Sequence, residues 1–361
     1  MFSSKIKNIQ EEEIIKEIEA SFIESLPLER KNDYKWKLFY KYKDEQFKKI
    51  FRGIRNNTIN NEKKYIFVKQ LFIDFNESNK EKLKKILKEI YFLYLLKNTN
   101  YFVQISDYFY SDNKKFINLV FESDSLSLDY LILSKKYNYD NKLIKLIIYQ
   151  ISYGLYILHK NGIIHHDIKS SNILIDSKGG VSICDFGSAF FKENEKPHSS
   201  TLCYASPEYL NDTSNSDEKY DIWGLGVIML ELYLKTLKIF KNDDIDNRID
   251  QYNYLQTIFE KTENHSTNDL NNPSNQNKNF KNLLEQINDT DAQDFLKNIL
   301  VFDPKKRYSA KRALESKYLE EYYGFDPLDA PKIPSNFDYD KITQNEINHD
   351  TFIDFVEEMK K

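Results

Sequence analysis

The feature that most constrains this 361-residue chain is a pair of polar motifs on either side of a short predicted β-hairpin. His165–Asn172 (HHDIKSSN) precedes the first strand, Ile173–Ile175, and Asp185–Gly187 (DFG) follows the second strand, Val181–Ile183. The intervening DSKGG sequence is typical of a turn. Because a hairpin returns its two ends to the same place, we expect the two motifs to lie close together.

The two motifs supply the functional groups of a magnesium-phosphate site. Asn172 and Asp185 offer the hard oxygen ligands that Mg²⁺ takes together with phosphate oxygens. Asp167 can accept the proton of an attacking hydroxyl, and Lys169 can neutralise a moving phosphoryl group. This set therefore predicts phosphoryl transfer, which depends mainly on positioning and charge stabilisation.

The order of the predicted elements indicates an α+β fold. An antiparallel sheet with one helix should come first, and a larger helical region should follow from Leu128 onward. The strands are expected at 36–42, 47–54, 64–74, 102–110 and 116–122, and the helices at 80–96, 141–160, 221–234 and 291–301. A further amphipathic helix is predicted at 5–26, either packed on the main domain or serving as a regulatory or partner helix.

Composition excludes several classes of protein. The 52 basic and 56 acidic residues give a net charge of -4, which argues against a nucleic-acid binder. The two cysteines, Cys184 and Cys203, cannot form a disulfide framework and favour a reducing compartment. Neither a secretory signal nor a membrane span is recognisable. We expect a monomer in the cytoplasm, the nucleus or both, with no nucleic-acid or membrane partner.

In this order the motifs resemble those of the eukaryotic protein kinases. His165–Asn172 is similar to the catalytic loop, the DFG motif is intact, and Ser206–Glu208 stands where the family has Ala-Pro-Glu. Lys169, two residues after Asp167, resembles the serine/threonine type. The segments 300–307, 318–323 and 337–358 are similar to the C-terminal part of the mitogen-activated protein kinases. Thr201–Tyr204 is similar to the cyclin-dependent kinases, and both belong to the CMGC group.

The resemblance implies a bilobal kinase fold with defined boundaries. The implied segments are an N-terminal extension at 1–33, a kinase domain at 34–322 and a C-terminal tail at 323–361. Within the domain, the N-lobe spans 34–122, the hinge 122–125 and the C-lobe 126–322, with an Asn-rich insert at 264–282. The extension and the tail are candidates for contact with a regulatory or docking partner.

The resemblance also assigns roles to individual residues. Lys69 would bind the ATP α- and β-phosphates with Glu89 as its partner, Asp167 would be the base and Lys169 would stabilise the transferring group. Thr201 would support the catalytic loop, and Asn172 and Asp185 would bind Mg²⁺. The ATP contacts would be Ile50, Phe47, Phe121, Glu122, Ser123 and Asp124, and the structural residues would be Glu208, Asp221 and Arg307.

Three departures from the family pattern affect these expectations. The segment 43–50 contains none of the expected glycines, so ATP binding should be weakened or altered. His166 replaces the arginine that binds an activation-segment phosphate, so activity should not depend on phosphorylation of Ser199, Ser200 or Thr201. Leu202 and Ala205 replace two arginines of the CMGC group, which weakens the case for proline-directed specificity.

We therefore expect a serine/threonine kinase that transfers the γ-phosphoryl group of Mg-ATP to a protein hydroxyl. The alternative is a pseudokinase that acts as a binding scaffold, and the missing glycines and His166 motivate it. A retained set of six polar side chains argues for the enzyme, because a scaffold has no physical need of them. The six are Lys69, Glu89, Asp167, Lys169, Asn172 and Asp185.

Overall fold

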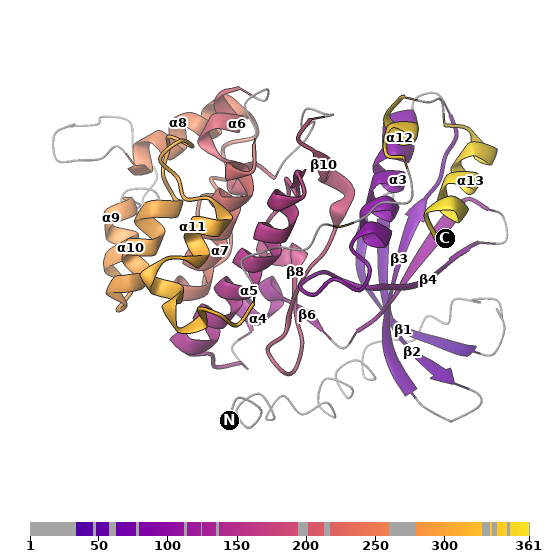
Figure 1. Ribbon diagram of the computed structural model, residues 1–361, viewed down its shortest axis with the longest axis horizontal. Coiled ribbons are helices and arrows are strands. Elements are labelled where there is room, and N and C mark those ends of the chain that lie inside the picture. Colours follow the sequence, from indigo (N-terminus) through magenta and orange to yellow (C-terminus); the bar gives the residue numbers. More distant parts are fainter. Residues whose placement is uncertain are drawn as a thin grey trace. The chain divides into compact units, whose positions relative to one another are not determined.

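The computed structural model describes thirteen stretches of the chain, within which two compact units are found (Figure 1). The described residues are 34–45, 48–57, 63–76, 79–111, 114–123, 125–134, 137–193, 201–212, 217–259, 279–326, 333, 338–344 and 347–360. The first unit comprises Met1–Leu126, Leu174–Gly187 and Ile333–Lys361, and the second comprises Ser127–Ile173 and Ser188–Lys332. The expectations for 1–33, Phe47, Asp124, Ser199 and Ser200, and for most of the 264–282 insert, lie outside the described residues.

The first unit contains a five-stranded antiparallel sheet in the order β1-β2-β3-β5-β4. Its strands are β1 (Tyr34–Glu45), β2 (Lys48–Asn57), β3 (Lys63–Phe72), β4 (Ile105–Tyr110) and β5 (Phe116–Glu122). Side chains along a strand point alternately to the two faces of the sheet, and this buries a cluster of Phe51, Ile66, Val68 and Val120. The β3 register places Lys69 opposite Ile50 on one side and Leu119 on the other.

Helix α3 (Lys80–Leu95) of the first unit forms because its apolar residues recur at helical spacing. Leu83, Leu87 and Ile90 on this stripe are at most 1% exposed. Glu89 belongs to the same buried set, so the helix carries a carboxylate into the interior. A charged group in such a place requires a partner.

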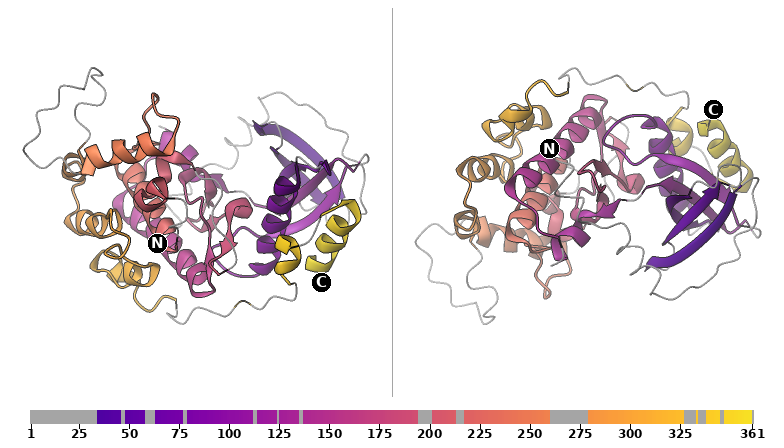
Figure 2. Two further views of the ribbon diagram at one scale, coloured as in Figure 1. Left: turned by 90° about the horizontal axis from the view of Figure 1, so that it is seen from above. Right: turned by 90° about the horizontal axis from the view of Figure 1, so that it is seen from below.

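The C-terminal tail packs on α3 through two helices, α12 (Asp340–Gln344) and α13 (His349–Lys360), which lie beside it in Figures 1 and 2. Tyr339 packs its ring against Tyr91 and Phe92, with centroid distances of 5.1 and 5.7 Å. Phe352 and Val356 of α13 are fully buried. The part of the tail from 338 to 360 therefore contributes to the first unit's core. The use of the tail for docking a partner stays a prediction.

The second unit is mainly helical. Its helices are α4 (Leu128–Leu133), α5 (Asn141–Lys160), α6 (Pro207–Asn211), α7 (Lys219–Leu234), α8 (Arg248–Phe259), α9 (Phe280–Glu285), α10 (Thr290–Ile299) and α11 (Ala310–Leu314), with short 3-10 turns η2 (Ser170–Asn172), η4 (Leu202–Tyr204) and η5 (Lys317–Tyr322). Helix α7 is apolar around its circumference and buried from Tyr220 to Leu232. It is contacted by both α5 and α10 and forms the centre of this unit. Among the described helices, none combines the length and hydrophobicity that a membrane span requires.

Short strands complete the fold. β7 (Ile163–Ile164) pairs antiparallel with β10 (Phe190–Phe191) in the second unit. β8 (Ile173–Ile175) and β9 (Val181–Ile183) form the expected hairpin, and η3 (Phe186–Ser188) follows it. Asp176 shapes the turn by accepting hydrogen bonds from the backbone amides of Lys178 and Gly180. β6 (Leu126–Ser127) lies where the chain passes from one unit to the other.

The predicted α+β class is confirmed, with an antiparallel sheet in one unit and helices in the other. The helix predicted at 141–160 and the two hairpin strands match residue for residue. The strand predicted at 102–110 was too long, because β4 begins only at Ile105. Phe102 instead forms a bridge with Ile183, and Val103 donates to the Ile183 carbonyl at 3.0 Å.

Candidate active site

Lys69 is the centre of a buried ion-pair network in the first unit. Its Nζ donates to the carboxylate of Glu89 and, at 2.9 Å, to Oδ1 of Asp185. Lys69 is 7% exposed and Glu89 is 5% exposed. Burial lowers the pKa of the ammonium, but attraction to Asp185 and Glu89 outweighs this, and the pKa of Lys69 is raised above its ordinary value. The Lys69 side chain therefore carries a positive charge at neutral pH.

Asp185 is held at the end of the hairpin by the residue that follows it. The Asp185 backbone is left-handed, with φ at 68°. Phe186 is fully buried, and its ring lies 6.3 Å from the Phe92 ring and 6.0 Å from the Phe102 ring, centroid to centroid. Packing of Phe186 against α3 and the Phe102 bridge thus fixes the direction in which the Asp185 carboxylate points. Cys184, which directly precedes Asp185, is partly buried.

The catalytic-loop residues form a second network, which lies in the second unit. Lys169 Nζ donates to Oδ2 of Asp167 at 2.7 Å and to Oγ1 of Thr201 at 3.0 Å. Thr201 Oγ1 donates in turn to Oδ1 of Asp167 at 3.0 Å. Asn172 Nδ2 donates to the backbone carbonyl and to Oδ2 of Asp167, at 2.8 and 2.9 Å. Both carboxylate oxygens of Asp167 are therefore oriented by donors.

Asp221, at the start of α7, holds the backbone of this loop. Its carboxylate is fully buried and accepts from the amides of His165 and His166 at 3.0 and 2.8 Å, and from Nε2 of His159 at 2.9 Å. Burial alone would raise the pKa of Asp221, but the hydrogen bond and charge of His159 lower it below its ordinary value. An ionised Asp221 thus fixes the two residues that precede Asp167.

The side chain of His166 is enclosed by aromatic rings. Its imidazole stacks on Tyr220 with centroids 4.0 Å apart and planes at 17°, and Tyr209 packs edge-on at 5.0 Å. Phe190 lies 5.6 Å away, and His166 is 1% exposed. The left-handed backbone at His166, with φ at 61°, directs the ring into this group. We refer to Tyr209, Tyr220 and Phe190 as the aromatic box.

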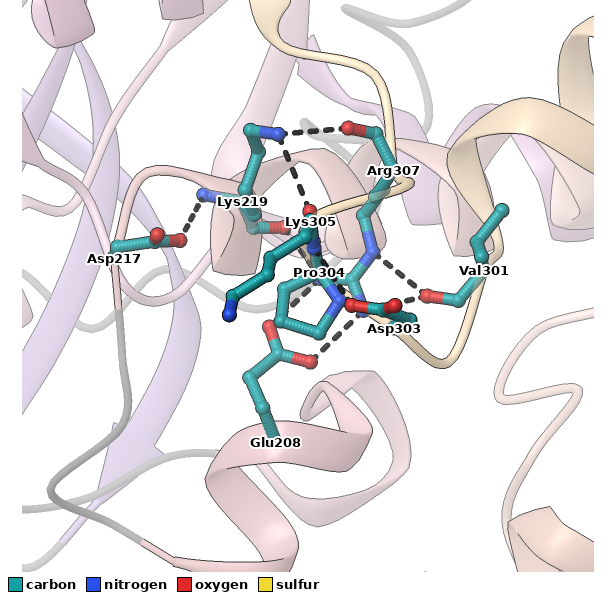
Figure 3. Close-up of polar contacts among 8 residues, drawn as sticks. All are labelled: Glu208, Asp217, Lys219, Val301, Asp303, Pro304, Lys305 and Arg307. Atoms are coloured by element: carbon teal, nitrogen blue, oxygen red, sulfur yellow. Dashed lines mark hydrogen bonds and ion pairs between the residues drawn. The ribbon is translucent and has the colours of Figure 1, made fainter.

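Glu208 and Arg307 form a bidentate ion pair, shown in Figure 3. Nη1 and Nη2 of Arg307 donate to the two carboxylate oxygens of Glu208 at 2.7 and 2.8 Å. The same guanidinium donates to the carbonyls of Val301 and Lys219 and lies 5.1 Å from the ring of Trp223. Arg307 is 2% exposed. Its charge can be buried because the guanidinium is paired with a carboxylate and its hydrogen bonds are satisfied. The pair ties α6 to the segment before α11.

Comparison with known proteins identifies the chain's relatives. The family model described as "Protein kinase domain" matches residues 49–319. The chain belongs to the protein kinase family. It is 31% identical over 266 residues to the mitogen-activated protein kinase hog1 of Aspergillus clavatus, covering 71% of this chain and 70% of that protein. It is also 31% identical over 266 residues to the mitogen-activated protein kinase sakA of Aspergillus fumigatus, with the same coverage, and 29% identical over 267 residues to hog1 of Trichoderma harzianum, covering 71% and 72%. The protein is a serine/threonine protein kinase.

The residues predicted to contact ATP in this kinase differ in their exposure to solvent. Phe121 is buried at the end of β5, Ile50 is partly buried on β2, and Glu122 is exposed. The Ser123 amide donates to the Tyr65 carbonyl at 3.1 Å, and its hydroxyl donates to Ser125. Their contacts with adenine stay predictions.

The seven polar residues of the kinase form two groups. Lys69, Glu89 and Asp185 belong to the first unit, and Asp167, Lys169, Asn172 and Thr201 to the second. The closeness of Asp185 to the catalytic loop, which we inferred from the hairpin, stays a prediction. The described residues contain no group of three or more His, Cys, Asp or Glu side chains that could hold a metal by itself.

Sequence reasoning missed Glu231 and the aromatic box of the kinase. Glu231 lies in the apolar helix α7 and is fully buried. The signal was available, because a carboxyl group in a buried helix must have hydrogen-bond partners. The box had no comparable signal, since Tyr209 and Tyr220 come from separate segments whose meeting depends on the tertiary fold.

Proposed function

We propose that this kinase transfers the γ-phosphoryl group of Mg-ATP to serine and threonine hydroxyls of proteins. The observation that carries the proposal is the closed network of Asp167, Lys169 and Thr201. Asp167 accepts the proton of the substrate hydroxyl, because both its oxygens are aligned and it sits where the resemblance puts the base. Lys169 neutralises charge on the group in transfer.

The proposed ligands of Mg²⁺ are the side-chain oxygen atoms of Asn172 and Asp185. Asn172 uses its Nδ2 to hold Asp167, which leaves the carbonyl oxygen of the same amide as the atom that can ligate a cation. The carboxylate of Asp185 is of the type that Mg²⁺ prefers. When bound, Mg²⁺ would neutralise phosphate charge, and these two residues would hold it.

Lys69 would hold the α- and β-phosphates in this proposal. Its raised pKa keeps the ammonium charged, and the salt bridge with Glu89 restricts its position. A cation that is fixed in advance loses little freedom when it binds phosphate. The proposal therefore assigns ATP orientation to Lys69 and Glu89, and chemistry to Asp167 and Lys169.

The glycine-free segment at 43–50 supports weakened or altered ATP binding. Backbone pairing between β1 and β2 continues as far as Glu45 and Lys48, so only two residues connect the strands. A loop without glycine carries a Cβ at every position, which limits how closely the backbone can approach phosphate. We infer an affinity for ATP below that of a kinase with a glycine-rich loop.

Activity that is independent of activation-segment phosphorylation is also part of the proposal. The aromatic box encloses the His166 ring, which is 1% exposed. An imidazole stacked in this way is a poor partner for a phosphate on another segment. Its packing fixes the residue before Asp167 by contacts that are already present.

A catalytically weak pseudokinase is the alternative function, and the glycine-free segment favours it. Under this alternative the protein acts as a binding scaffold. We propose the enzyme because the network around Asp167 satisfies a transfer requirement that scaffolding does not impose. We further propose a monomer of the cytoplasm, the nucleus or both, with 1–33 or 323–361 as the docking segment.

The test is transfer of labelled γ-phosphate from Mg-ATP to a mixture of proteins. The full-length chain is compared with Asp167→Asn, and acid hydrolysis of the labelled products identifies the phosphorylated residue. The proposal predicts phosphoserine and phosphothreonine at a rate well above that of the variant. Equal rates for the two proteins would leave only the scaffold.

A further inference from the structure

Gln104 lies at the end of the segment 96–104, which connects α3 to β4 and which we call the α3–β4 loop. The side-chain amide of Gln104 is bonded to the main chain of this loop at several points. Its Oε1 accepts from the amide of Asn98 at 2.6 Å. Its Nε2 donates to the carbonyls of Thr99 and Phe102 at 3.0 and 2.9 Å. One partly buried side chain therefore uses both its acceptor and its donors to hold the loop together.

The α3–β4 loop needs this support because two of its residues have left-handed backbones. Asn98 has φ at 64° and Tyr101 has φ at 73°. Neither residue is glycine, and for a bulky residue such as tyrosine this conformation is strongly disfavoured. Such a conformation persists only where the surrounding contacts hold it. The two carbonyls to which Gln104 donates lie on either side of Tyr101, so these bonds provide such contacts.

The α3–β4 loop holds the hairpin strand β9, which leads to Asp185. The Ile183 amide donates to the Tyr101 carbonyl at 2.8 Å, and the Val103 amide donates to the Ile183 carbonyl at 3.0 Å. Ile183 lies two residues before Asp185. The main chain of the loop therefore fixes the end of the hairpin from which the Asp185 carboxylate extends.

The α3–β4 loop also continues directly from α3, the helix that carries Glu89. Glu89 and Asp185 are the two carboxylates bonded to Lys69, and all of these residues belong to the first unit. We propose that Gln104 is a positioning residue, which sets both carboxylates around Lys69 by fixing the loop that supports them. The proposal rests on the role given above to Lys69 in binding the phosphates of ATP.

Loss of the Gln104 hydrogen bonds should weaken ATP binding through Lys69. Without them Tyr101 can leave the left-handed conformation, and the pairing of the loop with Ile183 loosens. Lys69 is then less fixed before it meets phosphate, and ordering it on binding costs free energy. The protein substrate should be affected less, because the catalytic-loop residues Asp167 and Lys169 belong to the second unit.

The test compares Gln104→Met with Gln293→Met. Methionine keeps the length of the side chain and removes its amide. Gln293 is the matched control, because it is partly buried in the second unit and its Nε2 also donates to a carbonyl, that of Ile287 at 2.8 Å. We expect Gln104→Met to raise the dissociation constant for Mg-ATP, measured by calorimetric titration, about fivefold, which corresponds to the loss of one ordinary hydrogen bond. The control should change it less than about twofold, and the KM for the protein substrate should stay within about twofold in both variants.

Hydrogen exchange of the same proteins provides a readout that depends on neither binding nor catalysis. Gln104→Met should speed amide exchange in the α3–β4 loop and also in 86–92 and 181–187, the segments that carry the two carboxylates. Gln293→Met should not change exchange in these segments. Wild-type affinity for Mg-ATP in Gln104→Met would overturn the proposal, whether exchange is unchanged or is faster only within the loop.

Failure of the proposed function can be distinguished from failure of this proposal. If the wild-type protein bound Mg-ATP but transferred no phosphate, the proposed function would fail, and the titrations would still decide the positioning role. If it bound no Mg-ATP, exchange in 86–92 and 181–187 would decide. Should Gln104→Met fail to fold, Gln104→Glu decides by the same measurements, because it keeps an acceptor for the Asn98 amide and removes the donors to Thr99 and Phe102.

Discussion

The imidazole of His166 stacks on the phenol ring of Tyr220, with 4.0 Å between ring centroids and 17° between planes. This contact uses the side chain that directly precedes Asp167 as a packing element. Its backbone amide is bonded at the same time to Asp221 at 2.8 Å. The residue before the proposed base is therefore fixed through both its side chain and its main chain.

The effect of replacing His166 on stability should depend on the shape of the new side chain and not on its charge. We expect His166→Phe to keep the stability within about 1 kcal/mol, because the ring still fills the aromatic box. His166→Ala should lower the free energy of unfolding by about 3 kcal/mol, since it leaves a cavity among Tyr209, Tyr220 and Phe190. Chemical denaturation measures both values. Equal destabilisation by Phe and Ala would refute the packing role.

Phosphatase treatment should leave the activity of the wild-type kinase unchanged. The reason is that His166 is held by the aromatic box and needs no phosphate to order it. The measurement is the initial rate of protein phosphorylation before and after treatment, with the phosphorylation state of Thr201 and its neighbours checked by mass spectrometry. A loss of most of the activity along with the phosphate would contradict this expectation.

Arg307→Lys should be strongly destabilising despite conserving charge. Lysine cannot bind Glu208 in a bidentate manner or reach the Val301 and Lys219 carbonyls together. We expect a loss of about 3 kcal/mol in the free energy of unfolding. Arg312→Lys, at an exposed position of α11, is the control and should change stability by about 0.5 kcal/mol or less. Similar losses for the two variants would show that the pair with Glu208 is unimportant.

Tyr339→Ala should loosen the C-terminal tail from α3. The Tyr339 ring contacts Tyr91 and Phe92, so its removal leaves a cavity that should cost about 3 kcal/mol. Hydrogen exchange in 340–360 and in α3 should become faster. Phe325→Ala serves as the control, because that side chain is 73% exposed. Unchanged exchange in α3 would mean that the tail does not brace the helix.

Much of this fold could be predicted from local patterns. The repeat of apolar residues in 141–160 and the turn between the hairpin strands depend on neighbours in the sequence, and both were predicted residue for residue. The predicted start of β4 was wrong because Phe102 pairs with Ile183 instead. Ile183 is distant in the sequence, so no local pattern reveals this pairing.

The candidate site likewise has a part that could be predicted from the sequence and a part that could not. The pairing of Lys69 with Glu89 was implied by the resemblance to the kinase family, and their contact is present. The enclosure of His166 could not be predicted, because its side chain was read only as a replacement for arginine. Neither could the donors to Glu231, since Ser170, Tyr204 and Lys238 meet only in the folded chain.

Stability should depend on pH through Glu231. Burial raises the pKa of its carboxyl group to about 7 from an ordinary 4.5, although its hydrogen bonds with Ser170 and Tyr204 lower it. The native protein then binds more protons than the unfolded chain between these values, so this group makes stability fall as the pH rises through that window. The stability of Glu231→Gln relative to wild type should accordingly increase by about 3 kcal/mol from pH 4.5 to pH 7. A constant difference would indicate an unshifted carboxyl group.

The most direct test of the phosphoryl-transfer account is the single-turnover rate constant for moving labelled γ-phosphate from Mg-ATP to a protein serine or threonine. It is measured for the wild-type kinase and for Asp167→Asn at the same ATP occupancy. We predict that the wild-type rate constant is about 10²- to 10⁴-fold larger, because asparagine cannot accept the hydroxyl proton. Equal rate constants in the two proteins would contradict the account.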